Sequence, residues 1–179
     1  SRGDLTGAER LYRESLAIFR EVSVREGEAR SLCNLGIIAE SRGDLDETER
    51  LYRESLAIYK EIGNRKGEAN LLNNLGIIAE SRGDLTGAER LYRESLAIYR
   101  EINDREGEAD LLDNLGLIAH NRGALHEAER LYRESLAIYR EINNQEGEAK
   151  SLENLGINAD RRGDLTGAER LYRESLAIY

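Results

Sequence analysis

The sequence contains no proline, tryptophan or methionine, and it has one cysteine and two histidines in 179 residues. The single thiol, Cys33, cannot form a disulfide within the chain, so a disulfide framework is excluded and a reducing, cytoplasmic setting fits best. No apolar run approaches the length of a membrane span, and no targeting or lipidation motif is present. The 17 glycines follow no G-X-Y order, which excludes collagen. With 40% apolar residues, the chain is expected to fold around a core rather than remain disordered.

An excess of basic charge is also lacking. The net charge is -9 and the pI is about 5.0. A nucleic-acid-binding protein needs a basic face to neutralise phosphates. Here the basic residues alternate with acidic ones, as in Glu49-Arg50 and Arg53-Glu54, so no basic stripe forms. Tyr52 and its equivalents recur at helical spacing, which indicates core positions rather than a stacking platform for bases. Neither nucleic acid nor membrane is expected as a partner.

Residues suited to catalysis or to binding a metal or cofactor are sparse. Neither G-x-x-x-x-G-K-[ST] nor G-x-G-x-x-G occurs, and the segment that begins at His126-Glu127 has Arg130 where a zinc protease has its second histidine. His120 and His126 are expected on the surface. Cys33 has no histidine in its repeat to serve as a base, and a nucleophile without a base is weak. We therefore expect no enzyme activity, no cofactor and no metal.

What the sequence does contain is a repeat of 40 residues. The copies are residues 1–40, 41–80, 81–120 and 121–160, followed by a half copy, 161–179. Such a period is typical of arrays in which each copy is one supersecondary element that stacks on its neighbours. The chain lacks a starting methionine and stops inside a helical pattern, so we expect a fragment of a longer array.

The first half of each copy predicts an amphipathic helix, here named helix B. Asp44 is a suitable N-cap, and the preceding Gly43 can end the previous helix in the left-handed conformation. Helix B is then expected from about Leu45 to Ile62. Its buried stripe has helical spacing and comprises Leu45, Thr48, Tyr52, Ser55, Leu56, Tyr59 and Ile62.

The second half of each copy predicts helix A, which follows a cap at Asn64 and stops at Gly83. A glycine in mid-helix costs roughly 1 kcal/mol relative to alanine. Gly76 and its equivalents therefore indicate a close approach to helix B, for which Ala88 would provide the facing position. Nine helices are expected in the order B-A-B-A-B-A-B-A-B, with antiparallel neighbours joined by short turns.

This pattern resembles the tetratricopeptide repeat (TPR). The residues that carry the resemblance are Asn74-Leu75-Gly76 followed by Gly83, Leu85, Ala88, Tyr92 and Leu96. The segment R-x-G-E-A-x-x-L-x-N-L-G at 65–76 is similar to the longer repeats of kinesin light chains and of G-protein-signalling modulators, although the usual proline after helix B is absent. The resemblance implies an all-α fold, a right-handed α-solenoid of antiparallel helix pairs that forms one domain over residues 1–179. It also implies that helix A lines a concave groove for a protein or peptide ligand.

Differences between the copies mark positions that the fold does not dictate. On helix A these positions share one stripe with an asparagine and an aliphatic residue. Three basic and six acidic residues occupy the variable positions, a sum of -3, so the partner is expected to be neutral or basic. The candidate peptide-binding residues are Arg30, Asn34, Ile37, Asn70, Asn73, Asn74, Ile77, Asp110, Asp113, Asn114, Leu117, Lys150, Glu153, Asn154 and Ile157.

The asparagines of this stripe have two interpretations. Asparagine is a poor helix former, yet it stands unchanged at 34, 74, 114 and 154. Its amide offers both a donor and an acceptor, so these side chains could form a ladder that binds the backbone of an extended peptide. Alternatively, each asparagine bonds to a neighbouring helix and braces the stack. The variable positions around it could also have drifted without consequence.

Two functions remain open from the sequence. One is a non-catalytic scaffold that binds an extended peptide, and the other is a structural or self-assembling array, either a natural spacer or a near-consensus engineered scaffold, without a dedicated ligand. The predicted solenoid ends lack polar capping helices, so association of copies through the ends is expected. Ala124 replaces the N-cap aspartate of the other B helices, at a cost of about 0.5–2 kcal/mol, so the fourth copy is expected to fray most easily.

Overall fold

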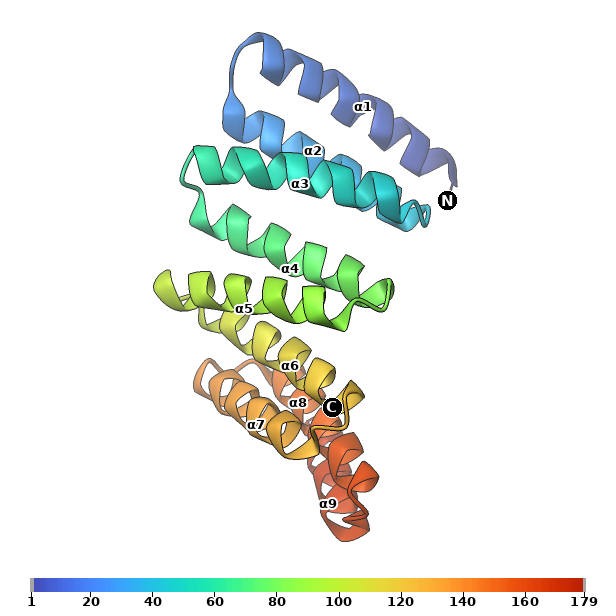
Figure 1. The fold of residues 1–179 in the computed structure, drawn as a ribbon, viewed down its shortest axis with the longest axis vertical. Helices are drawn as coiled ribbons and strands as arrows, with labels where there is room; N and C mark the ends of the chain where they lie inside the picture. The colour runs from blue at the N-terminus through green and yellow to red at the C-terminus, as the bar shows by residue number, and fades with distance from the viewer. Residues whose placement is uncertain (1, 179) are drawn as a thin grey trace. The chain divides into compact units, whose positions relative to one another are not determined.

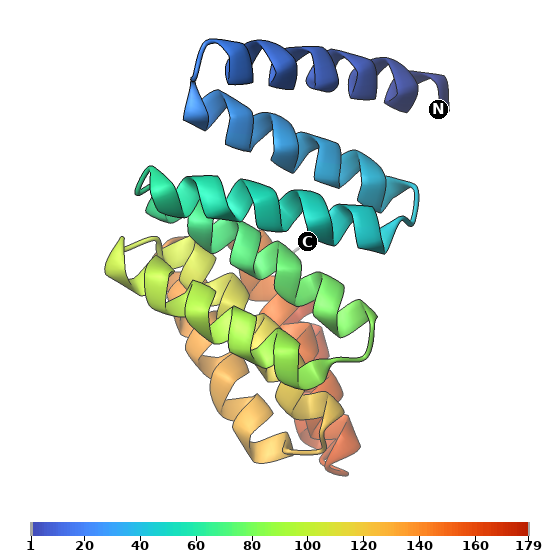
Figure 2. The same ribbon diagram turned by 45° about the horizontal axis from the view of Figure 1, so that its top comes forward.

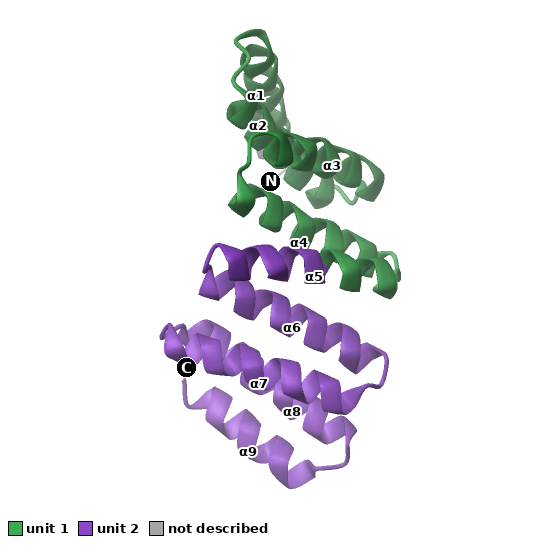
Figure 3. Ribbon diagram, turned by 60° about the vertical axis from the view of Figure 1, so that its left-hand side comes forward, with its two compact units in different colours: residues 1–91 green, residues 92–179 purple. Residues whose placement is uncertain are grey.

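The computed structural model describes residues 2–178, and over that range it contains nine α-helices and no strand. The helices are α1 (Arg2–Glu21), α2 (Arg25–Ser41), α3 (Leu45–Glu61), α4 (Arg65–Ser81), α5 (Leu85–Glu101), α6 (Arg105–Asn121), α7 (Leu125–Glu141), α8 (Gln145–Arg161) and α9 (Leu165–Leu176). They divide into two compact units, residues 1–91 and residues 92–179, with the boundary inside α5 (Figure 3). Helix B of the sequence corresponds to the odd-numbered helices and helix A to the even-numbered ones.

Within each unit, successive helices run antiparallel and pack side by side. In unit 1, α1 to α4 follow one another in this way through short turns (Figures 1 and 2). In unit 2, α6 to α9 do the same (Figure 3). Helix α2 packs more extensively on α3 than on α1, and α6 likewise packs more extensively on α7 than α7 does on α8. The closely packed pair is therefore a helix A with the helix B that follows it, and the predicted all-α fold is confirmed.

The helix ends lie where the capping residues predicted them. The Asp44 carboxylate accepts a hydrogen bond from the Glu47 amide at 3.1 Å, and the Asn64 side chain accepts one from the Gly67 amide at 2.8 Å. Gly43 has a φ of 78°, the left-handed conformation that glycine adopts without strain. Helix α3 ends at Glu61, one residue earlier than expected, so Ile62 lies at the turn and is 38% exposed rather than part of the buried stripe.

The close approach predicted for the mid-helix glycines is confirmed, and the contact is to a tyrosine ring. A Cβ atom on Gly116 would lie 2.5 Å from Cε1 of Tyr132, and one on Gly156 would lie equally near Cε1 of Tyr172. Tyr132 is almost fully buried. In unit 1, Gly36 contacts the Tyr52 ring in the same way. The glycines thus let the ring of helix B lie against the backbone of helix A.

A second set of glycine contacts was not predicted from the sequence. Tyr59, near the end of α3, packs its ring on Gly67 in the first turn of α4, where an added Cβ would lie 2.8 Å from the ring. Tyr99 makes the same contact with Gly107, at 2.5 Å from Cδ1. One tyrosine of helix B therefore packs on the preceding helix A and another on the following helix A.

Ion pairs around a buried glutamate join three successive helices. Glu28 on α2 is 6% exposed and receives hydrogen bonds from Arg20 Nε at 2.8 Å and from Arg25. The Arg20 guanidinium also bonds to Glu54 on α3, at 2.5 Å. Arg100 repeats this arrangement in unit 2 with Glu108 and Glu134, at 2.8 and 2.7 Å. These pairs connect a helix B, the following helix A and the next helix B.

The copy in α8 lacks the second arginine of this arrangement, the equivalent of Arg25, and so shows what that arginine contributes. In α8, Gln145 occupies the position of Arg25, and Arg140, at 2.7 Å, is the one basic partner of Glu148 among the described residues. The exposed fraction of the Glu148 side chain rises to 23%, compared with 8% for Glu28. The second arginine therefore shields the carboxylate from solvent.

Candidate functional site

The candidate binding residues lie on the even-numbered helices, on α2 and α4 in unit 1 and on α6 and α8 in unit 2. Eight of the fifteen are exposed: Arg30, Ile37, Asn70, Ile77, Leu117, Lys150, Glu153 and Ile157. Six are half-buried: Asn34, Asn73, Asn74, Asp110, Asn114 and Asn154. The remaining one, Asp113, is buried.

The aliphatic residues of the stripe are exposed on every helix A. Ile37 and Ile77 in unit 1 are 47% and 39% exposed. Leu117 and Ile157 in unit 2 are 40% and 50% exposed. Each stands three residues after an asparagine of the ladder, which is about one helical turn. Single exposed aliphatic residues are ordinary on protein surfaces, but the same position exposed on every helix A forms a patterned apolar surface.

The asparagine side chains of the ladder are not used to brace the stack in three of the four copies. Among the described residues, no hydrogen bond joins the side chain of Asn34, Asn74 or Asn154 to another residue. These amides are half-buried, so one part packs against the helix surface while the polar atoms remain accessible. They are therefore available to a ligand on the helix A face of each unit.

Asp113 departs from its predicted place on an exposed stripe. It is 2% exposed, because α8 packs against α6 and places Ser151 next to it. Burial raises the pKa of the Asp113 carboxyl to about 6, and the positive charge of Lys150 offsets part of that effect. The prediction that Asp113 lines a groove is wrong, because the next helix A covers this position of the stripe.

Other charges counted on the stripe are also engaged by neighbouring helices. Glu40 accepts a hydrogen bond from the Tyr52 hydroxyl at 2.9 Å, and Asp110 accepts one from the Tyr139 hydroxyl at 2.5 Å. Arg161 donates to the backbone oxygen of His120 at 2.6 Å. These side chains keep their charges, but neighbouring helices fix where the charged groups lie.

His120 is half-buried, whereas His126 is exposed as predicted. Nδ1 of His120 lies 3.0 Å from Oδ1 of Asn158, whose amide nitrogen donates to the Leu125 backbone oxygen at 2.9 Å. The signal for this contact was present in the sequence, since Asn158 stands where the other copies have an isoleucine, as at Ile118. The surface assignment of His120 is thus wrong.

Unit 2 has a small hollow where the first turns of α6 and α8 come together. Its volume is about 240 Å³, and its lining comprises Glu106, Asp110, Tyr139, Asn144, Glu146, Gly147 and Lys150. Three carboxylates face one ammonium group in this lining. The helix A face of unit 2 therefore carries local negative charge near the first turns of α6 and α8.

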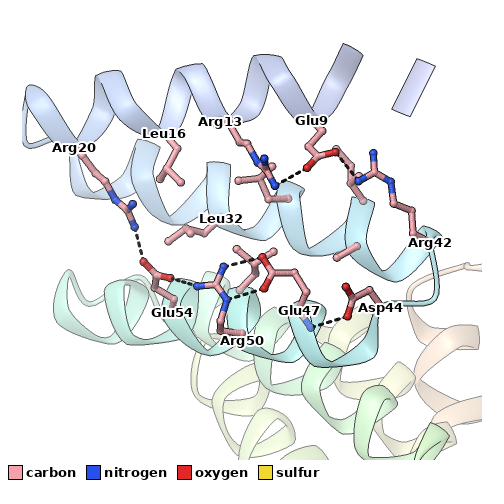
Figure 4. A pocket seen from close by; sticks show the side chains of 14 residues that line it. Glu9, Arg13, Leu16, Arg20, Leu32, Arg42, Asp44, Glu47, Arg50 and Glu54 are labelled. Carbon is pink, nitrogen blue, oxygen red and sulfur yellow. Dashed lines mark hydrogen bonds and ion pairs between the residues drawn. The ribbon is translucent and has the colours of Figure 1, made fainter. Parts of the chain in front are cut away.

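Unit 1 has a larger cleft that sequence reasoning missed. It lies between α1 and α3 with α2 beneath, and its volume is about 590 Å³ (Figure 4). Leu16 and Leu32 contribute to an apolar floor. The rim carries four arginines and four acidic residues. Figure 4 shows ion pairs between several of them, such as Arg20 with Glu54, while Asp44 bonds to the backbone amide of Glu47. The positive and negative groups of the rim are therefore equal in number.

The described residues contain no group of three or more His, Cys, Asp or Glu side chains arranged to hold a metal ion. The free thiol of Cys33 is half-buried and packs against a cluster that includes Leu71 and Leu75. Burial raises the pKa of the Cys33 thiol, which makes it a poorer nucleophile at neutral pH. Among the described helices, none combines the length and the apolar character that a membrane crossing requires.

Comparison with known proteins gives a consistent result. A family model described as tetratricopeptide repeat matches residues 1–61, 28–101, 67–141 and 107–179. The solved structure of BtubC (BKLC) from P. vanneervenii is 24% identical, with a TM-score of 0.89 over 99% of this chain and 74% of that protein. A kinesin light chain of Podosopora anserina with nearly identical TPR-like repeats is 18% identical, with a TM-score of 0.76 over 99% and 88%.

The apo form of RapI is 16% identical, with a TM-score of 0.88, and the chain spans 49% of its length. Among curated proteins, none matches the sequence. At these identities the structural likenesses establish the fold alone.

Proposed function

Because the chain belongs to the tetratricopeptide repeat family, whose repeats serve in protein interaction or as scaffolds, we propose that it is a non-catalytic scaffold that binds an extended peptide along helix A. The family resemblance seen in the sequence is thereby confirmed. The proposed binding face comprises the asparagine ladder and the exposed aliphatic residues, with α2 and α4 contributing in unit 1 and α6 and α8 in unit 2.

One observation carries this proposal: an exposed aliphatic side chain recurs on every helix A, and on α2, α4 and α8 it stands one turn after an asparagine whose side chain bonds to no described residue. Ile77 is 39% exposed and stands one turn after Asn74, whose side chain bonds to no described residue. An amide can bond to a peptide N–H or C=O in any sequence, while the aliphatic residue contacts a side chain of the ligand. Covering the aliphatic residue also removes apolar surface from water, which favours binding.

The charge of the face supports a neutral or basic peptide. In unit 2 the carboxylates of Glu106, Asp110 and Glu146 line the hollow and would attract a lysine or arginine of the ligand. Lys150 lies in the same lining and would weaken this attraction. In unit 1 the predicted residues carry one charge, Arg30, and are otherwise amides and aliphatic groups. We therefore expect basic residues of the peptide to bind preferentially to unit 2.

The test uses a library of extended peptides, from which the tightest binder is selected and its affinity is measured by calorimetry. Two double variants, Asn34→Ala with Asn74→Ala in unit 1 and Asn114→Ala with Asn154→Ala in unit 2, each remove the amides from one unit. Loss of two hydrogen bonds of about 0.5–1.5 kcal/mol each predicts a weakening of at least about fivefold for the unit that binds. Circular dichroism should show unchanged helicity for the unit 1 variant, since the side chains of Asn34 and Asn74 bond to no described residue.

Arg53→Ala and Arg133→Ala are the matched controls, because both arginines are exposed on helix B, away from the proposed face. Both controls should bind the peptide as the parent protein does. If both double variants also keep the parent affinity, the asparagine ladder does not bind the ligand and the proposal is wrong.

A structural or self-assembling array is the second candidate. The observation in its favour is exposed aliphatic residues on α1 and α9, where Leu11 and Leu176 are 56% and 73% exposed. Association of copies through these helices would cover both residues. Light scattering should then show a mass that rises with concentration, whereas a constant monomer mass at high concentration would contradict it.

The proposal includes no catalytic role and no resident cofactor, and it places the protein in the cytoplasm. The half-buried, free Cys33 thiol fits a reducing compartment.

A further inference from the structure

Asp113 is the centre of a buried polar chain that links α6, α7 and α8 in unit 2. Ser151 Oγ on α8 lies 3.1 and 3.2 Å from the two carboxyl oxygens of Asp113. It also lies 3.2 Å from Ser135 Oγ on α7. Ser135 in turn bonds to the Ala109 backbone oxygen on α6 at 2.9 Å. Asp113, Ser151 and Ser135 are all buried, so water does not complete their hydrogen bonds.

The position of the Ser135 proton follows from the repeat. Ser55 donates to the Ala29 backbone oxygen at 2.7 Å, and Ser175 donates to that of Ala149 at 3.1 Å. A backbone carbonyl can only accept, so Ser135 uses its one proton on Ala109. At its contact with Ser151, Ser135 must therefore be the acceptor.

The next proton has two possible places. Ser151 has one hydroxyl proton, which it can donate either to the carboxyl oxygens of Asp113 or to Ser135. If Ser151 donates to Ser135, its contact with Asp113 requires a donor on the carboxyl side, which only the neutral acid has. With a protonated Asp113, every link from Asp113 through Ser151 and Ser135 to the Ala109 carbonyl holds one proton. With an ionised Asp113, one of these buried contacts would bring two lone pairs together.

We propose that Asp113 carries a proton when α6, α7 and α8 are packed together, and that loss of this proton loosens α8 from its two neighbours. The buried chain of Asp113, Ser151 and Ser135 thus acts as a pH-sensitive latch within unit 2. Its ionisation couples the packing of α8, which carries half of the helix A face of that unit, to the pH of the medium.

The groups around Asp113 act in both directions. Burial and the nearby Asp110 favour the neutral acid, whereas Lys150 on α8 and hydrogen bonding with Ser135 and Ser151 favour the ionised carboxylate. On α7, Tyr139 donates its hydroxyl proton to Asp110. Burial outweighs the attraction of Lys150, and the pKa of Asp113 is raised to about 6.

The other copies do not contain this latch. The equivalent of Asp113 in α2 is Cys33, which packs against Leu71, the equivalent of Ser151. Ser31, at the position of Ser151 in α2, donates to the Gly27 backbone oxygen of its own helix at 2.9 Å. An acidic residue combined with a serine on the next helix A occurs in the described residues only at α6 and α8.

The direct test is the titration of the Asp113 carboxyl in the intact chain, followed by the ¹³C shift of labelled aspartate side chains between pH 3 and 8. Comparison with Asp113→Asn assigns the signal. A midpoint near 6 supports the proposal. A midpoint at or below about 4.5, close to that of an ordinary aspartate, would overturn it.

The second measurement is hydrogen exchange of the α8 backbone amides, corrected for the intrinsic pH dependence of exchange. The folded form binds the Asp113 proton more tightly than the open form, so protection should fall as pH rises from about 4 to 7, by about 100-fold for a shift of two units. Asp113→Asn should remove this fall in protection, because an amide can donate to Ser151 at every pH. The variant should fold, since Asn73 occupies the equivalent position in α4. Asp160→Asn, at an exposed site on α8, is the matched control and should behave as the parent. Equal pH profiles for the parent and Asp113→Asn would contradict the latch.

Discussion

Gly116 on α6 lies against the buried ring of Tyr132 on α7, with room for a hydrogen but not for a methyl group. An alanine at this position would place its Cβ 2.5 Å from Cε1 of the ring. Overpacking of this kind typically costs about 1–3 kcal/mol, which exceeds the gain of roughly 1 kcal/mol in helix propensity. We therefore expect Gly116→Ala to lower the free energy of unfolding in urea.

The same substitution in a Tyr132→Leu background provides its control, since the ring is then absent. In that background Gly116→Ala should be neutral or stabilising, because alanine has a higher helix propensity than glycine and no ring is left to clash with its methyl group. An equal loss in both backgrounds would show that the ring is not the cause.

Ala124 leaves the N-terminus of α7 without a side-chain cap. Its backbone angles, φ -79° and ψ 61°, are close to those of the capping Asp44, φ -84° and ψ 78°, so an aspartate fits without strain. We expect Ala124→Asp to stabilise the chain by about 0.5–2 kcal/mol. Hydrogen exchange in the first turn of α7 should slow, and Asp44→Ala should have the opposite effect on α3. Unchanged exchange in both variants would show that these caps contribute little.

We expect the ion pairs of Glu28 to make the unfolding free energy of the chain fall at low pH. Burial acts to raise the pKa of Glu28, but the hydrogen bonds from Arg20 and Arg25 outweigh it, and the pKa lies below its usual value. A carboxyl with a lowered pKa in the folded state contributes stability above its unfolded pKa and loses it as pH falls through the folded pKa. We expect Glu28→Gln to flatten the decline in unfolding free energy below about pH 4.5 and to cost about 1–3 kcal/mol at pH 7.

The pH dependence expected from Glu28 is opposite to that expected from Asp113. Stability from Glu28 is lost as the pH falls, whereas stability from Asp113 is lost as the pH rises. Glu61→Gln serves as a control, because the Glu61 side chain is 57% exposed although it also pairs with Arg25. In Glu61→Gln, the unfolding free energy should decline at low pH as it does in the parent protein. If Glu28→Gln also matches the parent protein, the ion pairs of the buried Glu28 do not govern acid stability.

The contact between His120 and Asn158 predicts a specific tautomer. The amide nitrogen of Asn158 must face the Leu125 carbonyl, so its oxygen faces Nδ1 of His120, at 3.0 Å. Nδ1 must then carry a proton in the neutral ring. The ¹⁵N shifts of neutral His120 should identify the Nδ1–H form, whereas the exposed His126 should show the mixture typical of a free ring. A neutral Nε2–H form at His120 would contradict the hydrogen bond.

Much of the fold could be predicted because helix-forming signals are local. The repeat of 40 residues, the cap at Asp44 and the left-handed Gly43 set the number, order and ends of the helices. The exposed positions of Ile77 and Leu117 also followed from the period of an α-helix, which states which residues share a face. The same reasoning placed Tyr52 and Tyr132 in the core.

Contacts between one copy and the next could not be predicted in this way. Asp113 and Ser151 are separated by nearly a full repeat, and only the stacking of α8 on α6 buries them together. The packing of Tyr59 on Gly67 and the shared arginine of Glu28 and Glu54 likewise depend on how neighbouring helices are oriented. The sequence by itself therefore determined which residues lie on which face of each helix. Tertiary structure decided which part of a face is covered by the next repeat. That coverage depends on the distance and angle between helices, and the periodicity of a single helix contains no information about either.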